Sequence, residues 1–292
     1  MKGGTLLVLL LFVSMTIWWS LAPGWAEWGA LALMICAGIP HGSFDLRVAK
    51  AKWRDAPLSH KKIVALYLGG VVGMGGLCVF APLIGLPLFL CISAIHFSEG
   101  EIHATTPPSP LVGAAYGVSA ILLPIGLHAR EAQGYMGYFV PPEIFSLIER
   151  PLEFVSYALA LLLGILISTA LVSKRGTDKA EHLQRLLCLC AWMILPPLSG
   201  FAVWFIGRHS LKHLQSCSEM FAGSRFGVPL DFAFISLLAI LGLLPFTLRF
   251  DFSRIEDLFA ASICLIAGLT LPHMIVSHRM SEIVPPRRNT PA

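Results

Sequence analysis

The sequence predicts an all-α protein that crosses a membrane about ten times, as a single integral membrane domain over residues 1–292. Of the 292 residues, 56% are hydrophobic and only 13% are charged, whereas charged residues make up about one quarter of an ordinary soluble domain. The mean hydropathy of +0.75 agrees with this class. Many apolar runs approach about 20 residues, the length of helix that spans a bilayer core of roughly 30 Å.

The apolar runs define ten predicted spans. They cover residues 5–21, 25–45, 63–80, 83–102, 111–127, 152–172, 183–198, 201–221, 232–244 and 258–277. The first run could also be a signal peptide, because Ala22 and Ala26 are small. The later spans, and a belt of tryptophans between residues 18 and 28, favour an uncleaved helix.

Basic residues orient the predicted bundle. The most basic loop follows the second span and contains Arg47, Lys50, Lys52, Arg54, Lys61 and Lys62. Such loops stay in the cytoplasm. If 201–221 spans, there are ten helices and the arginines at 279, 287 and 288 return to the cytoplasm; if it does not, there are nine and they fall outside. The preference of basic loops for the cytoplasm favours ten helices in the cytoplasmic membrane, with both termini on the cytoplasmic side. The net charge of +4 reflects this orientation and excludes nucleic acid as a partner.

Residues 130–150 form an aromatic-rich connection between the fifth and sixth spans, with Tyr135 and Tyr138 among its residues. Two interpretations remain open. A short helix on the membrane surface could cover the entrance for a ligand, or the tyrosines could form an interfacial belt.

Five of the ten histidines lie within predicted spans: His41, His96, His209, His213 and His273. An ionisable residue is costly in the bilayer and marks a functional site. His209 and His213 are four residues apart, so on a helix their side chains share one face. All five lie on even-numbered helices, which run in the same direction, and a rise of about 1.5 Å per residue places them at similar depths. We expect them to meet; the alternative is that each separately hydrogen-bonds a carbonyl or a serine.

A site of four neutral imidazoles suits iron, copper, nickel or zinc, whereas calcium and magnesium prefer oxygen ligands. It adds no negative charge and leaves coordination positions open, which fits a ferrous ion that must meet O₂. Each ring needs a partner for its second nitrogen. Asp45 follows His41 by four residues, and Glu99 and Glu101 follow His96. These carboxylates could orient the rings or could be solvated at the helix ends.

Four segments together resemble the Brp/Blh-type β-carotene 15,15′-dioxygenases. They are GIPHGSFD at 38–45, HFSEGE at 96–101, RHSLKH at 208–213 and LPHM at 271–274. The resemblance implies a multi-span membrane enzyme that uses Fe²⁺ and O₂ to split β-carotene at its central double bond. The product would be two molecules of retinal, often destined for a microbial rhodopsin.

Residue by residue, the resemblance implies that His41, His96, His209 and His213 bind the iron. Asp45, Glu101 and His273 are then expected to lie either next to the metal ligands or in the substrate pocket. Four aromatic residues adjoin the ligands and are candidate pocket residues or simple packing: Phe44, Phe97, Trp204 and Phe205. The chain departs from the family pattern at Ser98 and Glu101, and at Arg208, which must find a partner or extend towards the interface.

Three other functions are compatible with parts of the pattern. Intramembrane histidines and proline-broken helices also occur in metal transporters. A protein that binds retinal or a carotenoid without turnover, as an accessory to a rhodopsin, would share the apolar pocket. A membrane di-iron hydroxylase would need many more histidines, normally in adjacent pairs, and the sequence has no such pair.

Overall fold

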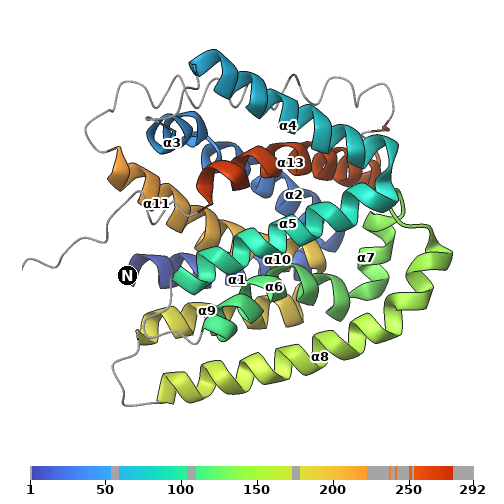
Figure 1. The fold of residues 1–292 in the computed structure, drawn as a ribbon. Helices are drawn as coiled ribbons and strands as arrows, with labels where there is room; N and C mark the ends of the chain where they lie inside the picture. The colour runs from blue at the N-terminus through green and yellow to red at the C-terminus, as the bar shows by residue number, and fades with distance from the viewer. Residues whose placement is uncertain are drawn as a thin grey trace, which may run out of the picture.

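The computed structural model describes residues 2–53, 59–103, 110–172, 178–221, 237, 241, 250–251 and 253–278. Within these ranges the chain is helical and contains no strand. The elements are α1 (Lys2–Leu21), α2 (Pro23–His41), α3 (Asp45–Lys52), α4 (His60–Phe80), α5 (Pro82–His103), α6 (Pro110–Leu127), α7 (Ala129–Met136), α8 (Pro142–Val172), α9 (Lys179–Ile194), α10 (Pro197–Trp204), η1 (Phe205–Ser210), α11 (Leu211–Met220) and α13 (Ile255–Ser277). In Figure 1, α4 and α8 lie on opposite sides of the bundle, and α2, α5, α10 and α13 lie between them.

Prolines and polar caps set the starts of these helices. Proline is the first residue of α2, α5, α6, α8 and α10, where its missing N–H costs no hydrogen bond and its fixed φ favours the helix. The side chain of Asp178 accepts from the backbone N–H groups of Ala180 and Glu181 and so caps α9. Ser59 accepts from the N–H of Lys62 and caps α4. The local sequence therefore determines where many of the helices begin.

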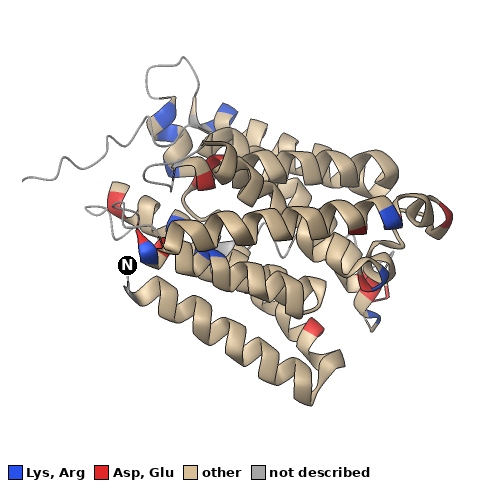
Figure 2. Cartoon of the chain, turned by 90° about the horizontal axis from the view of Figure 1, so that it is seen from below, with Lys and Arg blue, Asp and Glu red and all other residues tan. Residues whose placement is uncertain are grey.

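Six of the described helices are long and apolar enough to cross a bilayer: α1, α4, α5, α6, α8 and α13. Their outward surfaces carry large apolar side chains such as Phe80, Phe154 and Leu161, which suit lipid contact. Figure 2 shows Lys, Arg, Asp and Glu gathered near the two ends of the bundle, with a largely uncharged stretch between them. The chain is a membrane protein, and the predicted ninth span at 232–244 lies almost entirely outside the described residues.

Two predicted spans differ from the expectation of unbroken helices. The second stops at His41, and a turn at residues 42–44 leads into α3. The Lys52 ammonium at the end of α3 donates to the carbonyls of Ile275 and His278 at 2.9 and 2.7 Å. Because a cation satisfies the last carbonyls of a helix, this contact fixes α3 against the end of α13.

The predicted eighth span is also interrupted. It consists of α10, the π-helical segment η1 and α11. A π segment alters the register between the two flanking helices and commonly marks a functional site. Arg208 and His209 lie within η1, and His213 lies one turn later in α11. The spacing of four residues therefore does not describe one regular α-helix.

Glycines allow α5 and α6 to pack at backbone distance. Gly113 and Gly117 lie four residues apart on α6 and face α5. A Cβ at Gly117 would come within about 2.4 Å of the Ser98 backbone nitrogen. Small residues spaced four apart permit this approach in membrane helices. Since α5 carries His96, the contact also positions a candidate metal ligand.

Gly117→Ala should therefore destabilise the protein by about 3 kcal/mol, the upper end of the usual cost of overpacking. The expected result is a lower melting temperature in detergent. Gly134→Ala is a matched control, because no atom from elsewhere in the described residues lies within 4 Å of its Cβ position and alanine favours a helix. Equal melting temperatures for the two variants would contradict the close packing of α5 and α6.

Candidate metal centre

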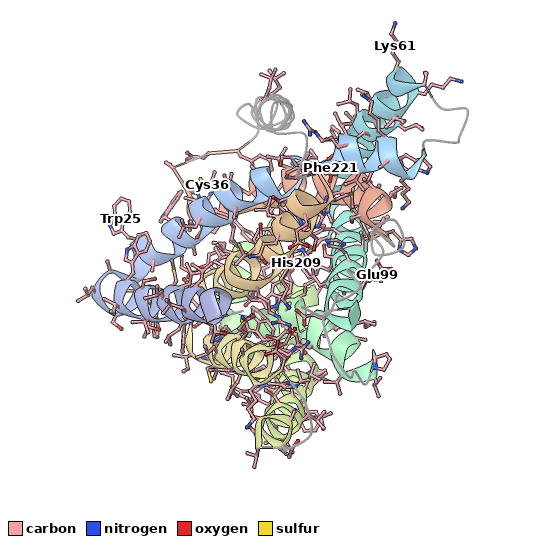
Figure 3. All side chains as sticks on the ribbon, turned by 90° about the vertical axis from the view of Figure 1, so that its left-hand side faces the viewer. Trp25, Cys36, Lys61, Glu99, His209 and Phe221 are labelled. Atoms are coloured by element: carbon pink, nitrogen blue, oxygen red, sulfur yellow. The ribbon has the colours of Figure 1, made fainter. Side chains whose placement is uncertain are left out.

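The structure brings the five intramembrane histidines into one cluster. His41 is the last residue of α2, and the others come from α5, η1, α11 and α13. The His41 ring lies 4.8, 4.4 and 4.7 Å, centroid to centroid, from the rings of His209, His213 and His273. The His96 ring lies 5.1 Å from both His209 and His273. Figure 3 shows His209 in the interior of the bundle, whereas Lys61 projects outwards.

Two overlapping groups of donor atoms can hold a metal ion. One contains His41, His96 and His209, and the other contains His41, His213 and His273. Within each group the donor atoms lie within 4.8 Å of one another. His41 belongs to both groups, so one cluster offers up to five imidazoles.

Four ring nitrogens in this cluster are buried and have no hydrogen-bond partner among the described residues. They are His41 Nδ1, His96 Nε2, His209 Nε2 and His273 Nε2. A buried polar group without a partner costs about 1–3 kcal/mol. A cation that these nitrogens coordinate would offset that cost. The donor set of neutral imidazoles fits a transition metal such as iron.

Asp45 orients His273. The Nδ1–H of His273 donates to Asp45 Oδ1 at 2.7 Å, and the Tyr67 hydroxyl donates to Asp45 Oδ2 at 2.8 Å. All three side chains are buried. Because Nδ1 carries the hydrogen, the buried Nε2 keeps a lone pair that a metal ion can bind. This arrangement matches the carboxylate–histidine pairs that orient ligands in metal sites.

Glu101 pairs with arginines, and its hydrogen bonds among the described residues do not include one to a histidine. Its two oxygens accept from Arg208 Nε and Nη2, both at 2.6 Å, and Arg185 Nη2 donates to Oε2 at 3.2 Å. Glu99, the other candidate, pairs at the surface with His278. Arg208 has therefore found its partner inside the protein, and it links the helix of His96 to the segment of His209.

Glu181 completes this charged network. Its Oε1 accepts from Arg208 Nη2 at 2.7 Å and from Lys212 Nζ at 2.9 Å. Burial raises the pKa of the Glu181 carboxyl, but Arg208 and Lys212 outweigh this effect and hold the pKa below its ordinary value. Glu181 therefore stays ionised at neutral pH and balances part of the positive charge beside the cluster.

Aromatic side chains surround the ring of His209. Trp204 and Phe205 stack on it with centroid distances of 5.2 and 5.8 Å, and Phe97 meets it edge-on at 4.7 Å. Phe97 and Phe205 also line a cavity beside the cluster. Of the other two predicted pocket residues, neither lines that cavity: Trp204 packs behind His209, and Phe44 stacks on Phe221.

The cavity is lined almost entirely by apolar side chains from α2, α5, α6, α7, α10, η1 and α13. His41, His96, His209 and His273 form part of its wall. Tyr135 of α7 lies at the cavity, and Tyr138 donates to the carbonyl of Val79. The cavity therefore offers an apolar space beside the imidazoles.

Sequence reasoning did not identify Tyr67 or Glu27 as part of this region. Tyr67 supports Asp45, and Glu27 accepts hydrogen bonds from Tyr135 and Ser199 at 2.8 and 2.7 Å. Both residues carry a signal, since each places a polar group within an apolar run. What the sequence does not show is which distant residues they meet.

Comparisons with known proteins agree with the resemblance noted in the sequence. The family model described as "Beta-carotene 15,15'-dioxygenase" matches residues 32–281. The chain is 26% identical to the "Beta-carotene 15,15'-dioxygenase" of uncultured marine bacterium 66A03, over 86% of this chain and 92% of that protein. It is 23% identical to the "Probable beta-carotene 15,15'-dioxygenase Blh" of Halobacterium salinarum, over 87% and 84% of the two chains. No solved structure matches the chain.

Proposed function

The chain belongs to the β-carotene 15,15′-dioxygenase family, and we propose that it cleaves β-carotene or a related carotenoid at the central double bond to give retinal. The observation that carries this proposal is the cluster of five imidazoles, four of which lie in the wall of an apolar cavity. A carotenoid partitions into the bilayer and has no charged group, so a cavity with an apolar lining suits it. The relatives' names support the same reaction.

The reaction is balanced without an outside reductant. Cleavage breaks one carbon–carbon double bond and forms two carbonyl groups, and each carbonyl takes one oxygen atom from O₂. A bound Fe²⁺ ion would supply the one-electron chemistry that lets O₂ react with a double bond. Because β-carotene is symmetric, central cleavage yields two identical products.

We assign the binding of this ion to His41, His96, His209 and His213, with His273 as a fifth imidazole turned towards them by Asp45. The support is the grouping of the donor atoms of all five histidines and the buried ring nitrogens of His41, His96, His209 and His273, which have no partner among the described residues. Phe97 and Phe205 line the cavity beside the ligands and would hold the polyene against them. The apolar walls exclude water from the reacting bond.

The proposed setting is the cytoplasmic membrane, with the whole chain as one domain and both termini inside. The support is the distribution of Lys and Arg in the loops. A product as apolar as retinal would pass to an acceptor in the same bilayer, and we propose a microbial rhodopsin as that partner.

Expression in bacteria that accumulate β-carotene tests the proposed reaction. We expect the cells to lose colour and the extract to contain retinal as the only cleavage product. A pair of apocarotenals of unequal length would contradict central cleavage. Unchanged β-carotene, with folded protein present in the membrane, would favour a binding protein or a transporter.

Asp45→Asn should weaken iron binding by about 10- to 100-fold, the usual effect of removing the partner that orients a metal-binding histidine. The variant removes the charge that accepts from His273 and leaves the five imidazoles in place. The affinity is measured by competition with a chelator. Glu99→Gln is a matched control, because it changes the other carboxylate that pairs with a histidine, His278 at the surface. Equal affinities for the two variants would contradict the role of Asp45.

A further inference from the structure

The cavity extends from the histidines mainly in one direction. Its lining begins at Leu31 on α2, at Leu86 on α5 and at Phe259 on α13, and reaches His41, His96 and His273 on the same helices. These intervals are 10, 10 and 14 residues, or about 15 to 21 Å at 1.5 Å per residue. Along these segments, the lining past the histidines is limited to Gly42, Asp45 and Phe97. The cavity therefore offers space for one side of a molecule that is bound at the histidines.

Side chains from four elements pack together at the far end of the cavity. Leu31 of α2, Leu198 of α10 and Phe259 of α13 belong to one buried cluster, and Tyr135 of α7 packs against it. The rings of Tyr135 and Phe259 lie 5.5 Å apart, centroid to centroid. All four residues line the cavity. We call these four residues the end wall.

Hydrogen bonds hold the end wall in place. The Tyr135 hydroxyl donates to Glu27 Oε2 at 2.8 Å, and the Ser199 hydroxyl donates to Glu27 Oε1 at 2.7 Å. Glu27 is buried and belongs to α2, and Ser199 belongs to α10. The carboxylate thus ties α7 to α2 and α10. The Tyr135 ring is fixed in position before any ligand binds.

We infer that the end wall is the stop for the terminal ring of one half of the carotenoid, and that its distance from the histidines selects the double bond that is cleaved. This inference rests on the proposed function. An extended chain advances ~1.2 Å per bond, so the roughly nine bonds between the central double bond and a terminal ring span ~11 Å. The ring fills the remainder of the ~15 Å between Leu31 and His41. The other half of the substrate lies on the opposite side of the histidines.

The position of the end wall then determines the products. The next double bond is two chain bonds away, or ~2.4 Å. Removing a large side chain from the wall lets the ring move deeper by a similar distance. A neighbouring double bond then lies at the histidines. One product becomes longer than retinal and the other becomes shorter.

The experiment compares the cleavage products of purified variants supplied with iron and β-carotene. Phe259→Ala shortens the end wall. Phe89→Ala also removes a phenyl ring, but from the side of the cavity, between the end wall and His96. Phe154→Ala makes the same change on the exposed surface of α8. Leu31→Ala removes a smaller part of the wall and carries the test if Phe259→Ala has no cooperative unfolding transition.

We expect apocarotenoids of unequal length to outnumber retinal for Phe259→Ala and to be detectable for Leu31→Ala. Phe89→Ala and Phe154→Ala should still give retinal alone, with a slower rate for Phe89→Ala. Retinal as the sole product of both wall variants would overturn the inference and leave the proposed function intact. The same mixed products from Phe89→Ala and Phe259→Ala would also overturn it, because general loosening of the cavity would then explain them. A wild-type protein that forms no retinal would overturn both proposals.

Discussion

His209→Ala is expected to abolish retinal formation and to lower the affinity for iron at least ~100-fold. Removing a group that only hydrogen-bonds a metal-binding histidine already costs up to ~100-fold, and removing the histidine itself should cost at least as much. His209 belongs to the donor group with His41 and His96, and its Nε2 has no other partner among the described residues. Alanine removes that donor and leaves the aromatic side chains around it. The measurements are iron per chain and retinal formed from β-carotene.

His182→Ala is the control for this variant. His182 lies in α9 and belongs to neither donor group. Its iron content and turnover should equal those of the wild type. Full activity in His209→Ala would contradict the assignment of the metal centre, whatever the behaviour of the control.

Glu101→Gln is expected to lower the free energy of unfolding by about 3–5 kcal/mol, the cost of breaking a buried ion pair by removing one partner. The network contains three cations, Arg185, Arg208 and Lys212, and two carboxylates, Glu101 and Glu181. Its formal charge is therefore 3 − 2 = +1. Glu101→Gln raises this charge to +2, and both arginines remain buried.

Arg208→Met should cost less than Glu101→Gln, because it lowers the charge of the network to zero and leaves Glu101 paired with Arg185. The double variant should be more stable than Glu101→Gln alone, since it also removes the Arg208 cation that has lost its Glu101 partner and keeps only Glu181. Unfolding in detergent of the two single variants and the double variant measures these differences. If Arg208→Met were the more damaging of the two single changes, the charge balance would not explain the network.

The sequence predicted the class of the fold and the convergence of the histidines for a simple physical reason. Hydropathy and helix rise depend on local sequence, so depth along each span could be estimated before the packing was known. His41, His96, His209, His213 and His273 meet as expected from depth and direction alone.

The partners of the carboxylates could not be predicted in the same way. A turn at residues 42–44 starts a new helix at Asp45, so a spacing of four from His41 says nothing about the direction of the carboxylate. The π segment has a similar effect on Arg208, which meets Glu101 across the bundle. Both outcomes depend on breaks in regular helices, and the hydrophobic pattern does not show such breaks.

The sequence also could not predict which aromatic residues line the pocket. Phe97 and Phe205 line the cavity, but Phe44 and Trp204, which are equally close to ligands in sequence, do not. The end wall combines residues from positions 31, 135, 198 and 259. No local pattern connects positions so far apart, and only the packing of α2, α7, α10 and α13 brings them together.

The most direct test of the account is the stoichiometry of the reaction in purified protein. Protein stripped of metal by a chelator and then titrated with Fe²⁺ is supplied with β-carotene and O₂, and the products are separated by chromatography. We predict two retinals for each β-carotene consumed, at a rate that rises with the iron bound. A product pair of unequal length, or no turnover by folded protein that holds iron, would contradict the account.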